Sequence, residues 1–195
     1  MSAAASRCLM ENLMTQTPEP GSALPLPANL RVGVVVGNPK PASRTYQAAV
    51  HLAERLAGRA PDLTVDLAEY AGLLDWSDAA TAAAVAGVTD LDLLVVASPT
   101  YKASYTGLLK VFLDRFRADA LAGVVAVPLM LGAGPGHAMA PEVFLKPVLA
   151  ELSAVLPTRA LYLLDTSYDD PAAYEPWLAA ARRPVLAALR SPVSP

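Results

Sequence analysis

Cysteine is nearly absent from this sequence, and Cys8 is the only one among 195 residues. A single cysteine excludes an intrachain disulfide and a metal site built from several cysteines. The two histidines, His51 and His137, are too few for a histidine-rich metal site, so we expect no bound metal. This cysteine usage is typical of a reducing compartment, and the expected location is the cytoplasm.

Strong net charge and long uninterrupted hydrophobic runs are lacking as well. The formal charge is −3, from 18 acidic and 15 basic residues, and the basic residues form no stripe. We therefore expect no nucleic-acid partner and no membrane-surface partner. The longest stretch without a charged residue, residues 120–141, is interrupted by Pro128, by Pro135 and by the three glycines at 132–136, so we do not expect it to span a membrane.

Aromatic residues are also scarce, at 6%, whereas hydrophobic residues make up 54% and many of them are alanine. Small residues at this density favour close packing of helices against a sheet. The length suits one domain. Residues 1–29 lack hydrophobic periodicity and are rich in proline between positions 18 and 27, which predicts a disordered N-terminal extension before a single domain at residues 30–190.

From Leu30 onward, short apolar segments alternate with amphipathic ones. The expected strands cover residues 32–36, 63–67, 91–97, 124–131 and 161–164. The expected helices cover residues 45–57, 79–86, 106–117, 138–155 and 172–189, with kinks at Pro147 and Pro184. Five apolar strands that alternate with helices predict an α/β fold with a doubly wound parallel sheet and right-handed crossovers.

The loop after the first expected strand, residues 37–45, combines an amide, two hydroxyls and a guanidinium, in the sequence GNPKPASRT. It lacks the G-x-G-x-x-G of a dinucleotide fold and the Gly-Lys-Ser/Thr of a P-loop. Free N–H groups at a helix start attract phosphate, to which Ser43, Arg44 and Thr45 can add donors. This loop alone is consistent with two interpretations: a site for one phosphomonoester, or an ordinary capped helix without a ligand.

A second polar loop follows the third expected strand, which Ser98 and Pro99 should end because proline cannot donate to a sheet ladder. In open α/β sheets, ligands bind at this edge. The stretch 99–110, PTYKASYTGLLK, closely resembles the second flavin loop of the NAD(P)H-dependent FMN reductases, especially the branch that serves alkanesulfonate monooxygenases. The first loop is similar to that family's phosphate loop, G-S-P-R-x-x-S-R-[ST], with Asn38 in place of a serine.

A third stretch, residues 132–137 with the sequence GAGPGH, follows the fourth expected strand. Its glycines suit either a simple strand–helix turn or a close approach of the backbone to a flat ring. The family has a glycine-rich loop at this point, then a histidine and a helix with a Leu-[KR]-Pro-Val-Leu run. Here His137 and residues 145–149, LKPVL, match that pattern in register.

This resemblance covers about residues 30–165 and implies a flavodoxin-like, five-stranded sheet of order 2-1-3-4-5 with helices on both faces, in an FMN-binding domain at residues 30–190. It implies hydride transfer from NAD(P)H to flavin N5 without a catalytic side chain. The branch implies a flavin reductase that supplies reduced FMN to a flavin-dependent monooxygenase. An NAD(P)H quinone or azo reductase is an alternative, as is a flavodoxin-type electron carrier, although carriers are usually more acidic than −3.

The implied FMN-binding residues lie in the three loops. The phosphate would be held by Asn38, Ser43, Arg44 and Thr45. The ring would lie along Pro99, Thr100, Tyr101, Lys102, Ala103 and Ser104, and against Gly132, Ala133, Gly134 and His137. Lys102 either favours negative charge on the reduced flavin or is simply solvated, and Tyr101 either packs or stacks.

The helices expected at 106–117 and 138–155 are apolar around most of their circumference. Helices of this kind are buried on two sides, which predicts a homodimer or homotetramer. The branch often carries a tyrosine or histidine where Val143 stands here, beside Phe144. This departure leaves both flavin exchange and subunit assembly open.

Overall fold

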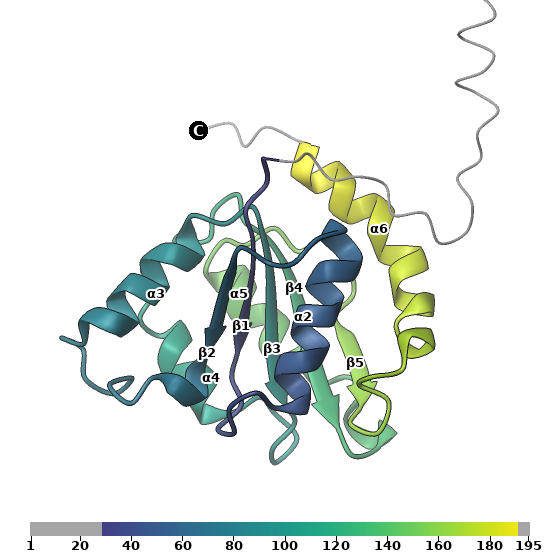
Figure 1. Ribbon diagram of the computed structural model, residues 1–195, viewed down its shortest axis with the longest axis horizontal. Coiled ribbons are helices and arrows are strands. Elements are labelled where there is room, and N and C mark those ends of the chain that lie inside the picture. Colours follow the sequence, from purple (N-terminus) through teal and green to yellow (C-terminus); the bar gives the residue numbers. More distant parts are fainter. Residues whose placement is uncertain (1–28, 191–195) are drawn as a thin grey trace, which may run out of the picture.

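A computed structural model describes residues 29–190 of the chain, so the predicted disordered extension lies outside the described residues except for Asn29. The described residues form one five-stranded parallel sheet with the order β2-β1-β3-β4-β5 (Figure 1). Its strands are β1 (Val32–Val36), β2 (Leu63–Asp66), β3 (Leu93–Pro99), β4 (Val125–Gly132) and β5 (Leu161–Leu164). The predicted sheet and strand order are therefore confirmed.

The three central strands are buried along their whole length. Val34 lies opposite Val95, which lies opposite Val127, so apolar residues form continuous rows across the sheet. Successive side chains of a strand point to opposite faces of the sheet. Because helices cover both faces here, every position of these strands is apolar or small and the strands are unbroken apolar runs in the sequence.

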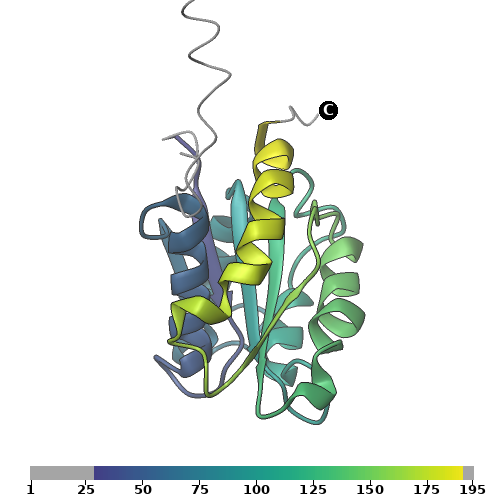
Figure 2. The same ribbon diagram turned by 90° about the vertical axis from the view of Figure 1, so that its right-hand side faces the viewer.

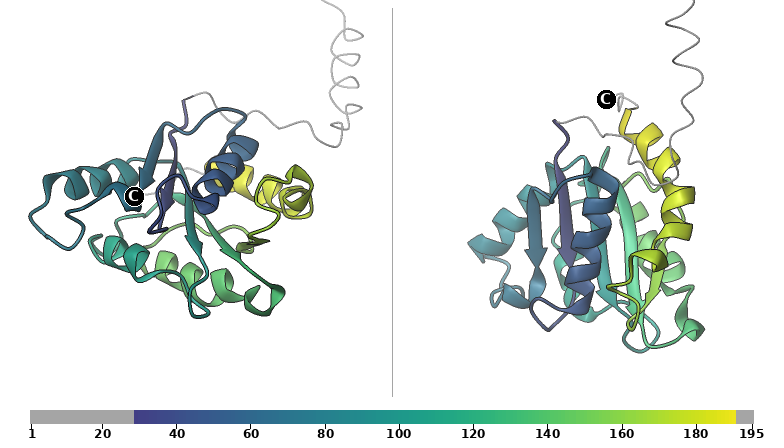
Figure 3. Two further views of the ribbon diagram at one scale, coloured as in Figure 1. Left: turned by 60° about the horizontal axis from the view of Figure 1, so that its bottom comes forward. Right: turned by 45° about the vertical axis from the view of Figure 1, so that its right-hand side comes forward.

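Helices cover both faces of the sheet, as Figures 2 and 3 show. On one face, α2 (Arg44–Ala57) and α6 (Glu175–Arg190) pack against a buried cluster that includes Val34 and Val95. The other face carries α3 (Ala79–Thr89), α4 (Gly107–Leu113) and α5 (Lys146–Glu151). None of the helices in residues 29–190 combines the length and apolar character that a bilayer crossing requires.

Two predicted boundaries around β3 are wrong. The strand continues through Pro99, because the backbone N–H of Thr100 donates to the Leu131 carbonyl at 2.6 Å and carries the ladder past the proline. The helix expected to reach residue 117 ends at Leu113. Beyond it, the Arg115 guanidinium donates to the carbonyls of Leu73 and Asp75, which ties this turn to the segment after β2.

The region expected as one helix over residues 138–155 is instead divided into two helical parts, of which the second ends at Glu151. A 3-10 turn, η2 (Pro135–His137), precedes a π-helical turn, η3 (Pro141–Leu145), and only then does α5 begin. In the π turn, the Lys146 N–H donates to the Pro141 carbonyl. Pro147 has no N–H to offer the regular ladder, and the wider turn lies directly before it. Likewise, α6 begins at Glu175 rather than 172 but continues through Pro184.

The ion pair between Glu142 and Lys146 and its further hydrogen bonds connect the π turn to the segment before β5. The Lys146 ammonium donates to Glu142 Oε1 at 2.6 Å and to the Thr158 carbonyl at 2.8 Å. The other Glu142 oxygen accepts from the Ala160 N–H at 2.7 Å. Burial opposes ionisation of Glu142, but the Ala160 N–H and Lys146 outweigh it and hold the pKa of Glu142 below its ordinary value. Lys146 thus has a structural role in this chain.

Replacing Lys146 with methionine should lower the free energy of unfolding by about 1–3 kcal/mol, because a half-buried carboxylate and a carbonyl lose a charged donor. Lys110→Met is the matched control, since Lys110 forms an ion pair of the same helical spacing with Asp114 on the surface. That change should cost less than about 1 kcal/mol. Denaturant unfolding of both variants measures the difference, and equal losses would contradict the structural role of Lys146.

Candidate functional site

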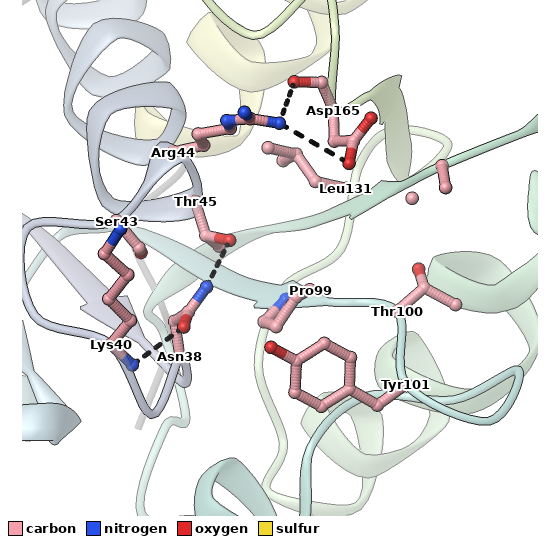
Figure 4. Close-up of a pocket in the computed structure, with 12 residues that line it drawn as sticks. Asn38, Lys40, Ser43, Arg44, Thr45, Pro99, Thr100, Tyr101, Leu131 and Asp165 are labelled. Atoms are coloured by element: carbon pink, nitrogen blue, oxygen red, sulfur yellow. Dashed lines mark hydrogen bonds and ion pairs between the residues drawn. The ribbon is translucent and has the colours of Figure 1, made fainter.

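The loops that follow β1, β3 and β4 converge on one pocket at the carboxyl edge of the sheet, which is the lower edge in Figure 1. The pocket has a volume of about 370 Å³. Figure 4 shows the side chains around it. The lining residues are Asn38, Lys40, Ser43, Arg44, Thr45, Pro99, Thr100, Tyr101, Leu131, Gly132, Ala133 and Asp165.

Most of the residues predicted to bind FMN therefore lie around one pocket. Five of them are not among its lining residues: Lys102, Ala103, Ser104, Gly134 and His137. Lys40, Leu131 and Asp165 line the pocket but were not among the predicted residues. Asp165 directly follows β5, so the carboxyl-edge rule could have identified it from the sequence.

The start of α2 presents two hydroxyl donors at the pocket. Ser43 caps the helix, and its oxygen accepts from the Tyr46 N–H at 3.2 Å. The Thr45 oxygen accepts from the Asn38 amide at 3.0 Å. Because each oxygen is used here as an acceptor, each hydroxyl keeps its proton to donate to a ligand. Both hydroxyls lie next to the positive end of the α2 macrodipole, which favours an anion.

Asn38 shapes this loop from within. Its side-chain Oδ1 accepts from the Lys40 N–H at 2.9 Å while its Nδ2 donates to Thr45 Oγ1, and the residue is only 8% exposed. Bonds inside the loop thus hold the Asn38 side chain, which orients the Thr45 hydroxyl.

Two residues from other elements, Asp66 at the end of β2 and Thr106 at the start of α4, also hold this loop by hydrogen bonds. The buried Asp66 carboxylate, at the end of β2, accepts from the Ala42 N–H at 2.9 Å, where Ala42 takes a left-handed φ of 48°. Thr106, which caps α4, donates to the Gly37 carbonyl at 2.6 Å and so links the first loop to the second. Asp66 was not among the predicted site residues, although it lies next to the end of the strand expected at 63–67.

The loop after β3 forms a tight hairpin. Tyr101 and Ser104 exchange backbone hydrogen bonds of 2.8 and 3.1 Å. Between them, Lys102 and Ala103 have φ angles of 51° and 66°, a pair of left-handed residues as in a type I′ turn. This conformation is strained for residues other than glycine, and such strain is concentrated at ligand sites. Tyr101 stays 52% exposed at the rim of the pocket.

The glycine-rich loop after β4 forms the opposite wall. The Gly132 carbonyl accepts from the Asp165 N–H at 3.0 Å, and the Tyr162 hydroxyl donates to the Gly134 carbonyl at 2.6 Å. A Cβ at position 132 would overlap the Tyr162 hydroxyl, with Cζ at 2.9 Å, so a side chain here would displace Tyr162 from its bond to Gly134. Burial raises the pKa of Tyr162 above its ordinary value, which keeps its hydroxyl a donor.

Three charged residues line the pocket: Lys40, Arg44 and Asp165. Arg44 and Asp165 approach to 3.6 Å between guanidinium Nη1 and carboxylate Oδ2. Within residues 29–190, no group of three or more histidine, cysteine, aspartate or glutamate side chains is placed to hold a metal ion. The arrangement suits an anionic ligand with a flat body: donors at one end, and close backbone walls at the other.

Comparison with known proteins agrees with this geometry. A family model described as NADPH-dependent FMN reductase matches residues 30–169. The chain is 33% identical over 156 residues to NADH-dependent FMN reductase SfnF of Pseudomonas putida, covering 75% of this chain and 84% of that one. It is 48% identical over 63 residues to FMN reductase (NADPH) of Escherichia coli K12, which is 32% of this chain and 33% of that protein.

A solved structure supports the same assignment. The apo form of NADH:FMN oxidoreductase (EMOB) superposes with a TM-score of 0.76 and 28% identity, covering 84% of this chain and 92% of that one. The sheet order, the three loops at its carboxyl edge and the match over residues 30–169 lead to one assignment: the chain belongs to the NADPH-dependent FMN reductase family.

Proposed function

We propose that this chain is an NAD(P)H-dependent FMN reductase that binds FMN in the pocket at the carboxyl edge of the sheet. The observation that carries the proposal is the phosphate cradle, the group of donors that Ser43, Arg44 and Thr45 form at the start of α2. Ser43 and Thr45 each keep a hydroxyl proton to donate, and Arg44 adds a guanidinium beside the helix N-terminus. Three donors around one helix end fit a single phosphomonoester.

The rest of the pocket suits a flavin ring. Pro99 and Thr100 supply one backbone edge, and Gly132 leaves the opposite wall free of a side chain. When bound, FMN supplies a ring that accepts hydride from the nicotinamide. The residues of this chain bind and orient: none of them has to act as an acid, base or nucleophile. They bring the flavin and the nicotinamide together. The two reactants therefore lose their translational and rotational freedom when they bind, and this loss does not add to the barrier of the hydride transfer.

The final recipient of the electrons is a finer part of this proposal. We infer that reduced FMN leaves the pocket and serves a separate flavin-dependent monooxygenase, which fits a site where the Arg44 side chain is 60% exposed. A bound flavin that passes electrons to a quinone or azo compound is the alternative. It would require FMN to stay in the pocket through the catalytic cycle.

Steady-state oxidation of NADPH and NADH at varied FMN concentration tests this function. A reductase that releases its flavin shows a rate that saturates with added FMN and falls to zero without it. A rate that depends on a quinone but not on added FMN would favour the alternative. No nicotinamide oxidation under either condition would contradict the proposal.

We also propose that the chain is a homodimer or homotetramer. The helix expected at 106–117 has little apolar surface left for a second subunit. Its large apolar side chains are already buried within the same chain: Leu109, Phe112, Leu113 and Phe116. The π-helical region remains the better candidate, since Met139, Val143 and Phe144 are 56%, 51% and 44% exposed. Adjacent exposed side chains of this size are typical of an interface.

Light scattering at micromolar protein should therefore give a multiple of the 20.3 kDa chain mass. Val143→Glu should shift the mass toward that of one chain, because burying an unpaired carboxylate in an interface is costly. Ala179→Glu serves as the control, since Ala179 is exposed on α6, which covers the opposite face of the sheet, and this change should leave the mass unaltered. A mass of 20.3 kDa for the unaltered protein would contradict the oligomer.

A further inference from the structure

The segment after β5 reaches across to the phosphate cradle. Asp165, the first residue after that strand, is fixed to the wall by its N–H bond to the Gly132 carbonyl at 3.0 Å. Its carboxylate Oδ2 lies 3.6 Å from Arg44 Nη1, and its carbonyl oxygen lies 3.4 Å from the same nitrogen. Figure 4 shows Arg44 extended toward Asp165, with dashed lines marking both interactions.

A third contact holds Arg44 in this position. The Arg44 guanidinium carbon lies 5.8 Å from the centre of the Tyr168 ring, which belongs to the same segment. Three groups of the β5–α6 connection therefore engage the guanidinium that belongs to the phosphate cradle. In this arrangement, the positive charge of Arg44 is matched by a carboxylate rather than left free for an incoming anion.

The contact is weak enough to be exchanged. The side chains of Arg44 and Asp165 are 60% and 37% exposed, and their distances are long for a charge-assisted hydrogen bond. An exposed ion pair of this kind contributes little stability. A phosphomonoester carries nearly two negative charges at neutral pH, so it competes well for the same guanidinium. Binding of the phosphate then has to displace the Asp165 carboxylate from Arg44.

We propose that Asp165 competes with the flavin phosphate for Arg44 and thereby weakens FMN binding enough for the reduced flavin to leave. The inference rests on the proposed function and adds a residue that tunes the exchange of flavin. Asp165 acts through Arg44, so it is a positioning residue. Its influence should extend to flavins with a phosphate and should spare riboflavin, which has none.

The test compares dissociation constants for FMN and riboflavin, measured by quenching of flavin fluorescence. Asp165→Asn keeps the size of the side chain and the backbone bond to Gly132 but removes the charge. The variant should bind FMN about tenfold more tightly and release it more slowly, with riboflavin binding changed less than about twofold. Riboflavin binding also reports that the variant is folded.

Two further variants make the result specific. In an Arg44→Ala background, Asp165→Asn should no longer tighten FMN binding, because the contested guanidinium is gone. Asp169→Asn is the matched control: it removes the same charge from the same segment, but Asp169 is exposed and does not line the pocket. Its FMN affinity should match that of the unaltered protein.

Several outcomes would overturn the inference. Weaker FMN binding by Asp165→Asn would mean that Asp165 orients Arg44 toward the phosphate. Unchanged FMN binding would mean that the carboxylate has no influence. Tightening that persists without Arg44 would mean direct repulsion rather than competition. If the unaltered protein binds neither flavin, the proposed function fails together with this inference, whereas the first three outcomes overturn this inference alone.

Discussion

Replacing Arg44 with alanine is expected to weaken FMN binding about 10- to 100-fold while riboflavin binding stays nearly unchanged. The guanidinium lines the pocket beside the Ser43 cap, where it adds a charged donor to a phosphate. Loss of a hydrogen bond to a charged group costs about 1.5–3 kcal/mol, and each 1.4 kcal/mol is about tenfold in affinity. Titration of both flavins, monitored by fluorescence, measures the difference.

Arg44→Lys provides the control for this prediction. Lysine keeps the positive charge but lacks the planar guanidinium that matches a phosphate. The FMN affinity of Arg44→Lys should therefore fall between that of the unaltered protein and that of Arg44→Ala. A loss shared equally by FMN and riboflavin would place Arg44 away from the phosphate and contradict the assignment of the cradle.

Gly37→Ala should lower the free energy of unfolding by about 1–3 kcal/mol, the usual cost of overpacking a core. A Cβ at position 37 would overlap Leu109, with its Cγ at 3.1 Å and its backbone Cα at 3.3 Å. Leu109 is fully buried in α4, so the helix itself must move. That movement would disturb the Thr106 bond to the Gly37 carbonyl, which joins the phosphate loop to the second loop.

Flavin binding should therefore fall together with stability in Gly37→Ala. For a chain of this size, the melting temperature should drop by roughly 2–12 °C. Gly107→Ala is the matched control, because a Cβ at position 107, at the start of α4, would meet nothing within 4 Å. Equal melting temperatures for the two variants would show that the close approach of α4 to the first loop is not needed.

The sheet was predictable because its signals are local. Apolar runs such as 32–36 and 161–164 identify strands without any knowledge of their neighbours, and the carboxyl-edge rule then brings the loops together. The end of α4 and the π turn were not predictable in this way. Arg115 ties the first to a distant segment, and Glu142 and Lys146 anchor the second to the segment before β5.

The candidate site was likewise predictable only where its signals are local in the sequence. The sequence carries the three loops in recognisable form, but not the partners of each side chain. Asp66 and Asp165 lie at the ends of strands, a position that the sequence indicates, but their partners Ala42 and Arg44 lie far away in the chain and no local pattern joins them. His137 matches the family pattern in sequence, yet it is exposed in the η2 turn and does not line the pocket.

Anaerobic mixing of the purified protein with FMN and then with NADPH or NADH tests the central claim most directly, with the visible absorption of the flavin as the readout. An FMN reductase bleaches the oxidised flavin band at catalytic protein concentration, and Arg44→Ala does so only at much higher FMN. A flavin band that persists in the presence of either nicotinamide, with the protein folded, would contradict the assignment.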